Sequence, residues 1–330
     1  MNPKYRVVIA GCGVIGGLYE ESSNPLTYSH GRAFSDNASF EIVGCIDSDI
    51  HKAKEFSQKY GIRSFGKDIE EIINETKPNI VSVCTPDNTH YEIVMTILSK
   101  GGPELKLIFL EKPACETLSD FSDMIRRSND LNIPVIVNMS RRYHTWYKWI
   151  KENYDRRQLG RLLRADILYY GGWNHNGVHA VDIVHFLFGE QLTDGQIFES
   201  WPGSEPNDPT YSARFETNNG ETVVWFHGFP EEHYQVFDCD FKFTTSRLQI
   251  CNFEETLYRR KAVVNALGET ILVTDITDLP KTKACPITEA VRVIEEYLKF
   301  LSKERLMGYL LQDTASTMNT VWELNKKNNA

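Results

Sequence analysis

The 330-residue sequence lacks the features that mark several large classes of protein. No window holds the roughly 18 consecutive apolar residues of a membrane span, and the N-terminus has no signal-peptide profile. Basic residues form no stripe and the net charge is −9, which disfavours nucleic acid and anionic membranes as partners. We therefore expect a cytoplasmic protein that binds neither.

Disulfide frameworks and cysteine-rich metal sites are also missing. The seven cysteines are scattered and include no Cys-x-x-Cys pair, a pattern that suits a reducing compartment. Repeats and low-complexity segments are absent. Hydrophobic residues make up 41% of the chain and charged residues 25%, as in ordinary globular proteins. The length predicts two domains.

The first feature that is present is a buried strand, Val7–Ala10, followed at once by Gly-x-Gly-x-x-Gly. In this dinucleotide-binding fingerprint the first glycine permits a tight turn and the second lets backbone N–H groups approach a pyrophosphate. The third lets the following helix pack closely, with its N-terminus towards the phosphates. The expected cofactor contacts here are Gly11, Gly13, Val14, Ile15 and Gly16.

An acidic residue ends the second predicted strand, Phe40–Ile46. Asp47 would accept hydrogen bonds from the adenosine ribose and repel a 2′-phosphate, so NAD is expected rather than NADP. The usual spacing from the fingerprint is about 20 residues, and here it is longer. We assign the surplus to an insertion within residues 18–29, where Ser-Ser-Asn-Pro breaks a helix.

Strands and helices alternate up to residue 137, which predicts a doubly wound parallel sheet of the Rossmann type. Ligands of such sheets bind beyond the carboxyl ends of the strands. Further cofactor contacts are therefore expected at Thr85, Pro86, Asn88, His90 and Glu111.

Several motifs together resemble the glucose–fructose oxidoreductase/inositol dehydrogenase/MocA family. They are the fingerprint, Thr-Pro-x-x-x-His at 85–90, Glu-Lys-Pro at 111–113, Asn-Met-Ser-Arg-Arg-Tyr at 138–143 and Gly-x-His-x-x-Asp at 177–182. The resemblance implies that Pro113 follows a cis peptide and that Lys112 reaches the reacting carbon. It also implies a second domain, residues 138–330, that binds substrate and forms oligomers, and terminal helices that return towards the first.

One position departs from the family pattern Asp-x-Gly-x-His-x-x-Asp. His175 occupies the place of the first Asp, whereas Lys112 and His179 are retained. A histidine titrates near neutrality and a desolvated lysine can share its role, so Lys112 and His179 form a minimal pair for alcohol–ketone chemistry. We assign catalysis to Lys112 and His179, with His175 assisting. No metal is expected, because His175, His179 and Asp182 lack a further ligand.

Polar residues of the second domain suit a carbohydrate-like substrate, and arginine would also suit a carboxylate or phosphate. The expected substrate contacts are Arg142, Tyr143, Asn174, Asn176 and Asp182. For Asp182, orienting His179 and a purely structural hydrogen bond remain alternatives.

Beyond residue 162 the pattern predicts an α+β domain with a large, mostly antiparallel open sheet. Its strongest signal is a hairpin across Asn218-Asn219-Gly220. One sheet face is expected to be aromatic and to require cover from helices or from a second subunit, which predicts a homodimer or homotetramer. The six aromatic residues assigned to that face are Tyr211, Phe215, Trp225, Phe237, Phe241 and Phe243.

The function expected from these features is hydride transfer between NAD and a secondary alcohol or ketone of a sugar, polyol or sugar nucleotide. Two alternatives stay open. One is a dinucleotide-binding sensor with little turnover, suggested by His175. The other is an epimerase-type enzyme that holds NAD tightly.

Overall fold

The chain forms two compact units in the computed structural model, which describes residues 4–21, 23, 25–203, 205, 207–218, 220–277, 279–281 and 285–328. The first unit spans residues 1–144 and 284–315, the second 145–283 and 316–330. The division expected at 137 thus falls at 144. Helix α8 (Pro286–Phe300) belongs to the first unit and nearly all of α9 (Ala315–Asn328) to the second. Within the described ranges, no helix is long and apolar enough to cross a membrane.

The first unit contains a six-stranded parallel sheet in the order β3-β2-β1-β4-β5-β6, the expected doubly wound arrangement. Its strands are β1 (Tyr5–Ala10), β2 (Phe40–Ile46), β3 (Ser64–Gly66), β4 (Ile80–Val83), β5 (Leu107–Leu110) and β6 (Val135–Val137). The crossovers are α1 (His30–Ser35), α2 (Ile50–Tyr60), α3 (Ile69–Thr76), α4 (His90–Lys100) and α5 (Leu118–Asp130). Short 3₁₀ turns lie at Asp87–Thr89, Ser140–Tyr143, Lys303–Leu306 and Leu311–Thr314.

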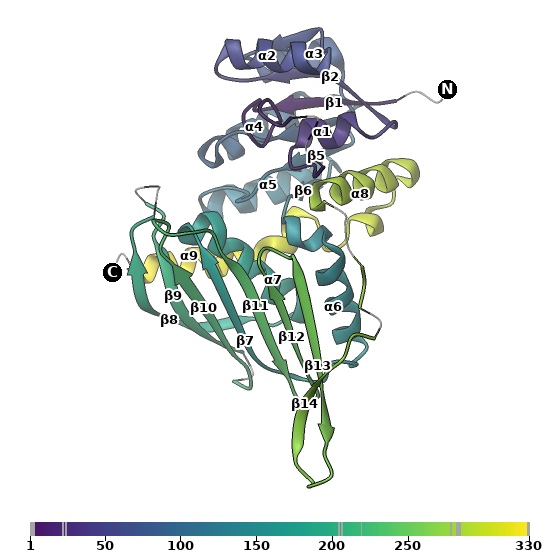
Figure 1. Cartoon of the computed structure of the whole chain (residues 1–330). Coiled ribbons are helices and arrows are strands. Elements are labelled where there is room, and N and C mark those ends of the chain that lie inside the picture. The colour runs from purple at the N-terminus through teal and green to yellow at the C-terminus, as the bar shows by residue number, and fades with distance from the viewer. Residues whose placement is uncertain are drawn as a thin grey trace. The chain divides into compact units, whose positions relative to one another are not determined.

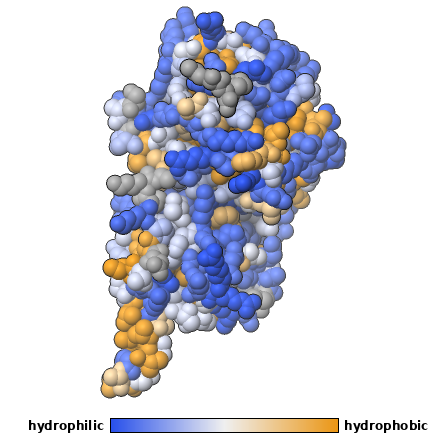
Figure 2. Space-filling view, turned by 90° about the vertical axis from the view of Figure 1, so that its right-hand side faces the viewer, coloured by the Kyte–Doolittle hydropathy of each residue, from blue (hydrophilic) through white to orange (hydrophobic). Residues whose placement is uncertain are grey.

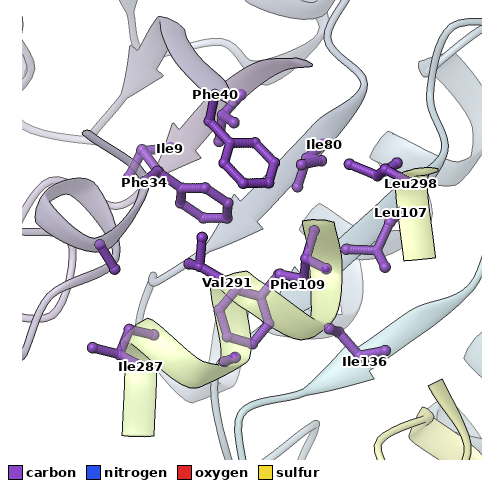
Figure 3. Close-up of a cluster of buried hydrophobic side chains, with 14 of the residues drawn as sticks. Ile9, Phe34, Phe40, Ile80, Leu107, Phe109, Ile136, Ile287, Val291 and Leu298 are labelled. Atoms are coloured by element: carbon purple, nitrogen blue, oxygen red, sulfur yellow. The ribbon is translucent and has the colours of Figure 1, made fainter. Parts of the chain in front are cut away.

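Helix α8 completes the core of the first unit (Figure 3). Its residues Ile287, Val291 and Leu298 belong to the same buried cluster as Phe109 of β5 and Ile136 of β6. The sheet face that would otherwise be open is therefore covered by a segment about 150 residues further along the chain than β6.

The second unit is built on an eight-stranded sheet in the order β14-β13-β12-β11-β7-β10-β9-β8 (Figure 1). All pairs are antiparallel except β7 with β10. The strands are β7 (Leu162–Tyr170), β8 (Leu192–Trp201), β9 (Thr210–Thr217), β10 (Val223–Phe229), β11 (Phe237–Phe243), β12 (Ser246–Cys251), β13 (Thr256–Val264) and β14 (Thr270–Thr274). Helices α6 (Thr145–Asp155), α7 (Val178–Phe188) and α9 lie on one face. The expected β9–β10 hairpin is present, although Asn219 of its turn lies outside the described residues.

The expected aromatic open face is wrong. Side chains alternate between the two faces of a strand, and five of the six aromatics assigned to that face are buried in the core of the unit: Tyr211, Phe215, Phe237, Phe241 and Phe243. The aromatic face was expected to be covered either by helices or by a second subunit, and in the structure helices cover it. Trp225 alone lies on the opposite face, since it alternates with the buried Val224 and Phe226.

That opposite face is charged instead of apolar. Asp166 of β7 accepts hydrogen bonds from Arg164 at 2.7 and 2.6 Å and from Lys242 at 2.7 Å, and Asp240 of β11 pairs with Arg247. Burial alone would raise the pKa of Asp166, but hydrogen bonds from His227, Arg164 and Lys242 hold it well below its usual range. Because this sheet face carries paired charges, the hydrophobic effect gives no reason for helices or a second subunit to cover it.

Candidate functional site

The three glycines of the fingerprint occupy three different environments. A Cβ on Gly11, whose φ is +92°, would lie 2.5 Å from the Cys84 carbonyl oxygen, and a Cβ on Gly16 would lie 2.1 Å from the Gly11 carbonyl oxygen. Neither position can take a side chain. A Cβ on Gly13 would meet no described atom within 4 Å, so the backbone here faces open space. This is the cradle that a pyrophosphate requires.

The first helix begins at the fingerprint and is interrupted by the insertion. Gly17 N–H donates to the Gly13 carbonyl, which closes one helical turn. His30 N–H then donates to Ile15 O at 3.0 Å and Gly31 N–H to Gly16 O at 2.9 Å. In a continuous helix the donors would be residues 19 and 20. Residues 19–29 are therefore looped out, and the helix resumes in register at His30.

Removing residues 19–29 from the count brings the spacing between Gly16 and Asp47 to about 20 residues, the usual value. The loop is tied down at its base. Lys59 donates to the carbonyls of Gly17, Leu18 and Glu20, and the Glu20 carboxylate accepts from two backbone N–H groups, of Tyr28 and Ser29. Ser22 and Asn24 of the loop lie outside the described residues.

Asp47 lies directly after β2, facing the glycine-rich turn. Its Oδ2 accepts the N–H of Cys12 at 2.9 Å, and its Oδ1 accepts the N–H of Asp49 at 2.9 Å. The carboxylate is half-buried and keeps further lone pairs for a sugar hydroxyl. The position is the one in which a ribose-binding acid is expected.

The segment after β4 is held to the Glu-Lys-Pro turn by a histidine. The two ring nitrogens of buried His90 each lie 2.8 Å from a carbonyl oxygen, of Pro113 and of Thr85. Thr89 Oγ1 also donates to Thr85 Oγ1. Pro86 and Asn88 are exposed. His90 is thus a structural tie between two loops, whereas the expected cofactor contacts Thr85, Pro86 and Asn88 keep exposed or half-exposed surface for a ligand.

Glu111 directly follows β5 and lies at the centre of a buried polar network. Its Oε1 accepts from His30 Nε2 at 2.7 Å and from Asn138 Nδ2 at 2.5 Å, and its Oε2 accepts the backbone N–H of Lys112 at 3.2 Å. His30 Nδ1 lies 2.6 Å from Ser82 Oγ. The network joins α1 to the carboxyl ends of β4, β5 and β6.

This environment fixes the charges of the pair. Burial alone would lower the pKa of His30, but Cys84 and Glu111 outweigh it and raise the pKa to about 10. Burial alone would raise the pKa of Glu111, and the hydrogen bonds and charges of His30, with Asn138 and Lys112, lower it instead. An imidazolium–carboxylate pair therefore lies next to Lys112 at neutral pH.

Lys112 itself is half-buried and precedes Pro113 through a cis peptide bond, the isomer that the family resemblance implied. Two of the expected substrate contacts, Arg142 and Tyr143, lie in the first unit, and both are buried. Arg142 donates to the carbonyls of Gly308 and Asp313, and Tyr143 stacks on Tyr309 with ring centroids 4.5 Å apart. Both side chains help to hold the end of the first unit in place.

In the second unit, a π-helical turn (Gly172–Gly177) presents Asn174, His175 and Asn176. The turn is fixed by Asp208, whose carboxylate accepts the N–H of Asn174 at 2.6 Å and of His175 at 2.9 Å. A Cβ on Gly172 would lie 2.1 Å from Asp208 Oδ2, so only glycine fits. The His175 side chain is exposed and those of Asn174 and Asn176 are half-buried.

Helix α7 carries the two remaining candidates. His179, in its first turn, is buried, as is Asp182. Asp182 Oδ1 accepts from Thr317 Oγ1 of α9 at 2.9 Å, which is a structural contact. Among the described residues, no group of three His, Cys, Asp or Glu side chains is arranged to hold a metal ion.

Sequence reasoning missed His30, Ser82 and Asp208 as site residues. Asp208 belongs to no recognised motif, and it reaches the π-helical turn from the segment just before β9. His30 had a signal that the insertion concealed: once residues 19–29 are set aside, it lies on the fingerprint helix. Asn138 stood at the end of a predicted strand, but its partner Glu111 could not be read from sequence.

Comparison with known proteins gives concordant matches. Residues 5–139 match the family described as "Oxidoreductase family, NAD-binding Rossmann fold". The chain is similar to a myo-inositol 2-dehydrogenase of Thermotoga maritima, with 25% identity over 203 residues that cover 57% of this chain and 56% of the relative. It therefore spans little more than half of the length of that curated relative.

Solved structures extend the likeness over nearly the whole fold. An oxidoreductase from Agrobacterium radiobacter in complex with NAD⁺, L-tartaric acid and magnesium has a TM-score of 0.72 at 16% identity, over 97% of this chain and 94% of that one. A super-repressor mutant of Gal80p from Saccharomyces cerevisiae has a TM-score of 0.77 at 15% identity, over 99% and 96%.

Proposed function

We propose that the chain is a member of the glucose–fructose oxidoreductase/inositol dehydrogenase/MocA family that acts as an NAD(H)-dependent oxidoreductase. The proposed substrate is a secondary alcohol or ketone of a sugar, polyol or sugar nucleotide. The observation that carries the proposal is Asp47, whose carboxylate holds the Cys12 amide of the glycine-rich turn from the end of β2.

The residues proposed to hold the cofactor fit its parts. The open side of Gly13 and the first turn of the interrupted helix suit a pyrophosphate, and Asp47 suits the adenosine ribose. When bound, the nicotinamide would accept or donate the hydride. Thr85, Pro86 and Asn88 are proposed as further contacts at the carboxyl end of β4.

Proton transfer is proposed for Lys112 and His179. A lysine ammonium can donate to a developing alkoxide or polarise a ketone, and a neutral imidazole can take a hydroxyl proton at working pH. The exposed His175, with Asn174 and Asn176 beside it, is proposed to bind the substrate or to tune His179.

Cofactor preference tests the first part of the proposal. Unaltered protein should bind NADH more tightly than NADPH, as measured by titration calorimetry. Asp47→Ala should weaken the binding of NADH by about tenfold to hundredfold, because a hydrogen bond to a charged group is lost. Asp47→Asn should lose less affinity for NADH and should bind NADPH more tightly than the unaltered protein does, because the charge that repels the 2′-phosphate is gone. Asp68→Asn removes the N-cap carboxylate of α3 and is the matched control. Tighter binding of NADPH by the unaltered protein would refute the preference.

The substrate class is tested by turnover. Mass spectrometry of ligand retained on the purified protein, followed by a screen of sugars and polyols for NADH formation, should identify a substrate that Lys112→Ala and His179→Asn no longer convert. An isomerised product formed without net NADH would point to an epimerase-type reaction that holds NAD tightly.

A second candidate is a dinucleotide-binding regulatory protein with little turnover. It is favoured by one observation, the histidine at position 175 where the family has an aspartate. Cofactor binding that depends on Asp47, with no conversion of any screened substrate, would support it over the first.

A further inference from the structure

The hairpin formed by β13 and β14 exposes an unusual amount of apolar surface. All five residues of β14 are exposed, and Val264, Leu267 and Ile276 beside it are 70%, 83% and 79% exposed. The hairpin extends beyond the neighbouring strands of its sheet, and apolar colour covers much of its projecting end (Figures 1 and 2). A patch of this kind marks an interaction site.

The two edges of the sheet are treated differently. At one edge, β8 pairs with β9 through two register shifts and carries Asp194 and Glu199, devices that discourage pairing with another chain. At the other edge, β14 pairs with β13 without a shift and has the sequence Thr-Ile-Leu-Val-Thr. It contains no charge, proline or bulge, so its edge is open to another strand.

The register shows which backbone groups of β14 point outward. Asn265 N–H donates to Glu269 O and Asp275 N–H to Arg259 O, which makes these the hydrogen-bonded pairs at the two ends of the ladder. Hydrogen-bonded pairs alternate along an antiparallel ladder, so Ile271 and Val273 also point their backbone groups towards β13. Those of Thr270, Leu272 and Thr274 point to the free edge.

We propose that β14 pairs with β14 of a second copy of this chain, antiparallel, about a two-fold axis at Leu272. The strand is self-complementary in that register: Leu272 faces Leu272 of the second copy, each Thr270 faces a Thr274, and each Ile271 lies beside a Val273. The outward residues then meet as hydrogen-bonded pairs, because 270, 272 and 274 on one copy oppose 274, 272 and 270 on the other. The interface is isologous and closes as a dimer.

Charge at the ends of the strand permits this pairing. In the same register Asp275 faces Glu269 of the second copy, which would bring two carboxylates together. Asp275 is already paired, with Lys261 Nζ at 2.6 Å and Arg259 Nε at 3.7 Å from its Oδ2. Its pKa is held below its usual range, mainly by the hydrogen bond with Lys261. The pairing therefore buries no unneutralised charge cluster.

Sedimentation analysis of charge variants tests the axis. Unaltered protein should be a dimer at micromolar concentration. Leu272→Lys and Leu272→Glu should each raise the dimer dissociation constant by about 100-fold or more, since a like charge then faces itself and an apolar contact is lost. Mixing the two variants should restore dimers, because the introduced lysine of one copy would face the introduced glutamate of the other. Phe198→Lys, on the opposite edge strand β8, is the control and should remain dimeric.

Cross-linking tests the register independently of those substitutions. Residues 271 and 273 of opposite copies form a non-hydrogen-bonded pair, whose Cα atoms lie about 4.5 Å apart and can carry a disulfide. The double variant Ile271→Cys/Val273→Cys should oxidise to a covalent dimer, whereas either single variant and unaltered protein should not. A monomeric unaltered protein, a dimer that both charge variants leave intact, or singles that cross-link as well as the double would each overturn the proposal. None of these outcomes depends on cofactor or substrate.

Discussion

His30 Nε2 lies 2.7 Å from Glu111 Oε1, and the histidine side chain is fully buried. The two residues are 81 positions apart, on α1 and at the end of β5. The contact exists because the fingerprint helix resumes in register after its insertion and so turns His30 towards the sheet.

His30→Gln should destabilise the protein in a pH-dependent manner. The folded-state pKa of His30 is raised to about 10, above its ordinary value near 6.5, so its charge stabilises the fold fully below pH 6.5. That stabilisation is lost as the pH rises through 10. The variant should lose about 3 kcal/mol near pH 6, the cost of breaking a buried pair, and much less near pH 10.

Guanidinium unfolding at both pH values measures the difference for His30→Gln. His51→Gln, at an exposed position of α2, is the control and should show no such dependence. An equal loss at pH 6 and pH 10 would mean that the hydrogen bonds matter and the charge does not.

Deletion of residues 19–29, which joins Leu18 to His30, should leave a folded protein. The His30–Ile15 and Gly31–Gly16 hydrogen bonds already follow helical spacing, so the deleted chain closes a continuous helix. NADH affinity should change by less than about threefold, since the contacts of Asp47 and the glycine turn are retained. Circular dichroism and calorimetry check both points, and a deletion of equal length that starts at residue 14 is the destabilising comparison.

Gly172→Ala and Asp208→Ala should both disturb the turn that presents His175. The first forces a methyl group against the Asp208 carboxylate, and the second leaves the Asn174 and His175 amides without their acceptor. Each should cost about 1–3 kcal/mol in unfolding free energy, with substrate affinity lost at the same time. NADH binding should be unchanged, because the glycine turn and Asp47 belong to the other unit. Loss of NADH affinity would argue against this separation.

Substitutions of the proposed acid and base should separate their roles. Lys112→Ala or His179→Asn should reduce kcat by about 10²–10⁴, the usual contribution of a positioned acid or base. His175→Asn should cost less and act mainly on KM. The reverse pattern, with His175→Asn inactive and His179→Asn unaffected, would exchange the two assignments.

Much of the fold could be predicted from the sequence because local periodicity carries it. The boundaries of β2 agree with the strand expected over Phe40–Ile46, and the fingerprint identified the first sheet. The face of the second sheet was predicted wrongly. Alternation shows that Phe237 and Phe241 share a side, but not which side the helices cover.

The candidate site was predictable where a motif is contiguous and obscure where contacts are long-range. Asp47 and Lys112 lie at strand ends that sequence can locate. The links of His30 to Glu111 and of Asp208 to the π-helical turn join residues 81 and about 33 positions apart, and no local pattern encodes them.

The return of α8 to the first unit has a consequence for how the chain is made. Ile287, Val291 and Leu298 complete the core around Phe109 and Ile136, so a ribosome must translate past residue 300 before that core can close. By then every strand of the second sheet has already been synthesised. In a nascent chain the core of the first unit should therefore stay incomplete while the strands of the second unit are synthesised. Residues 1–144 expressed alone should expose an apolar sheet face and depend on chaperones.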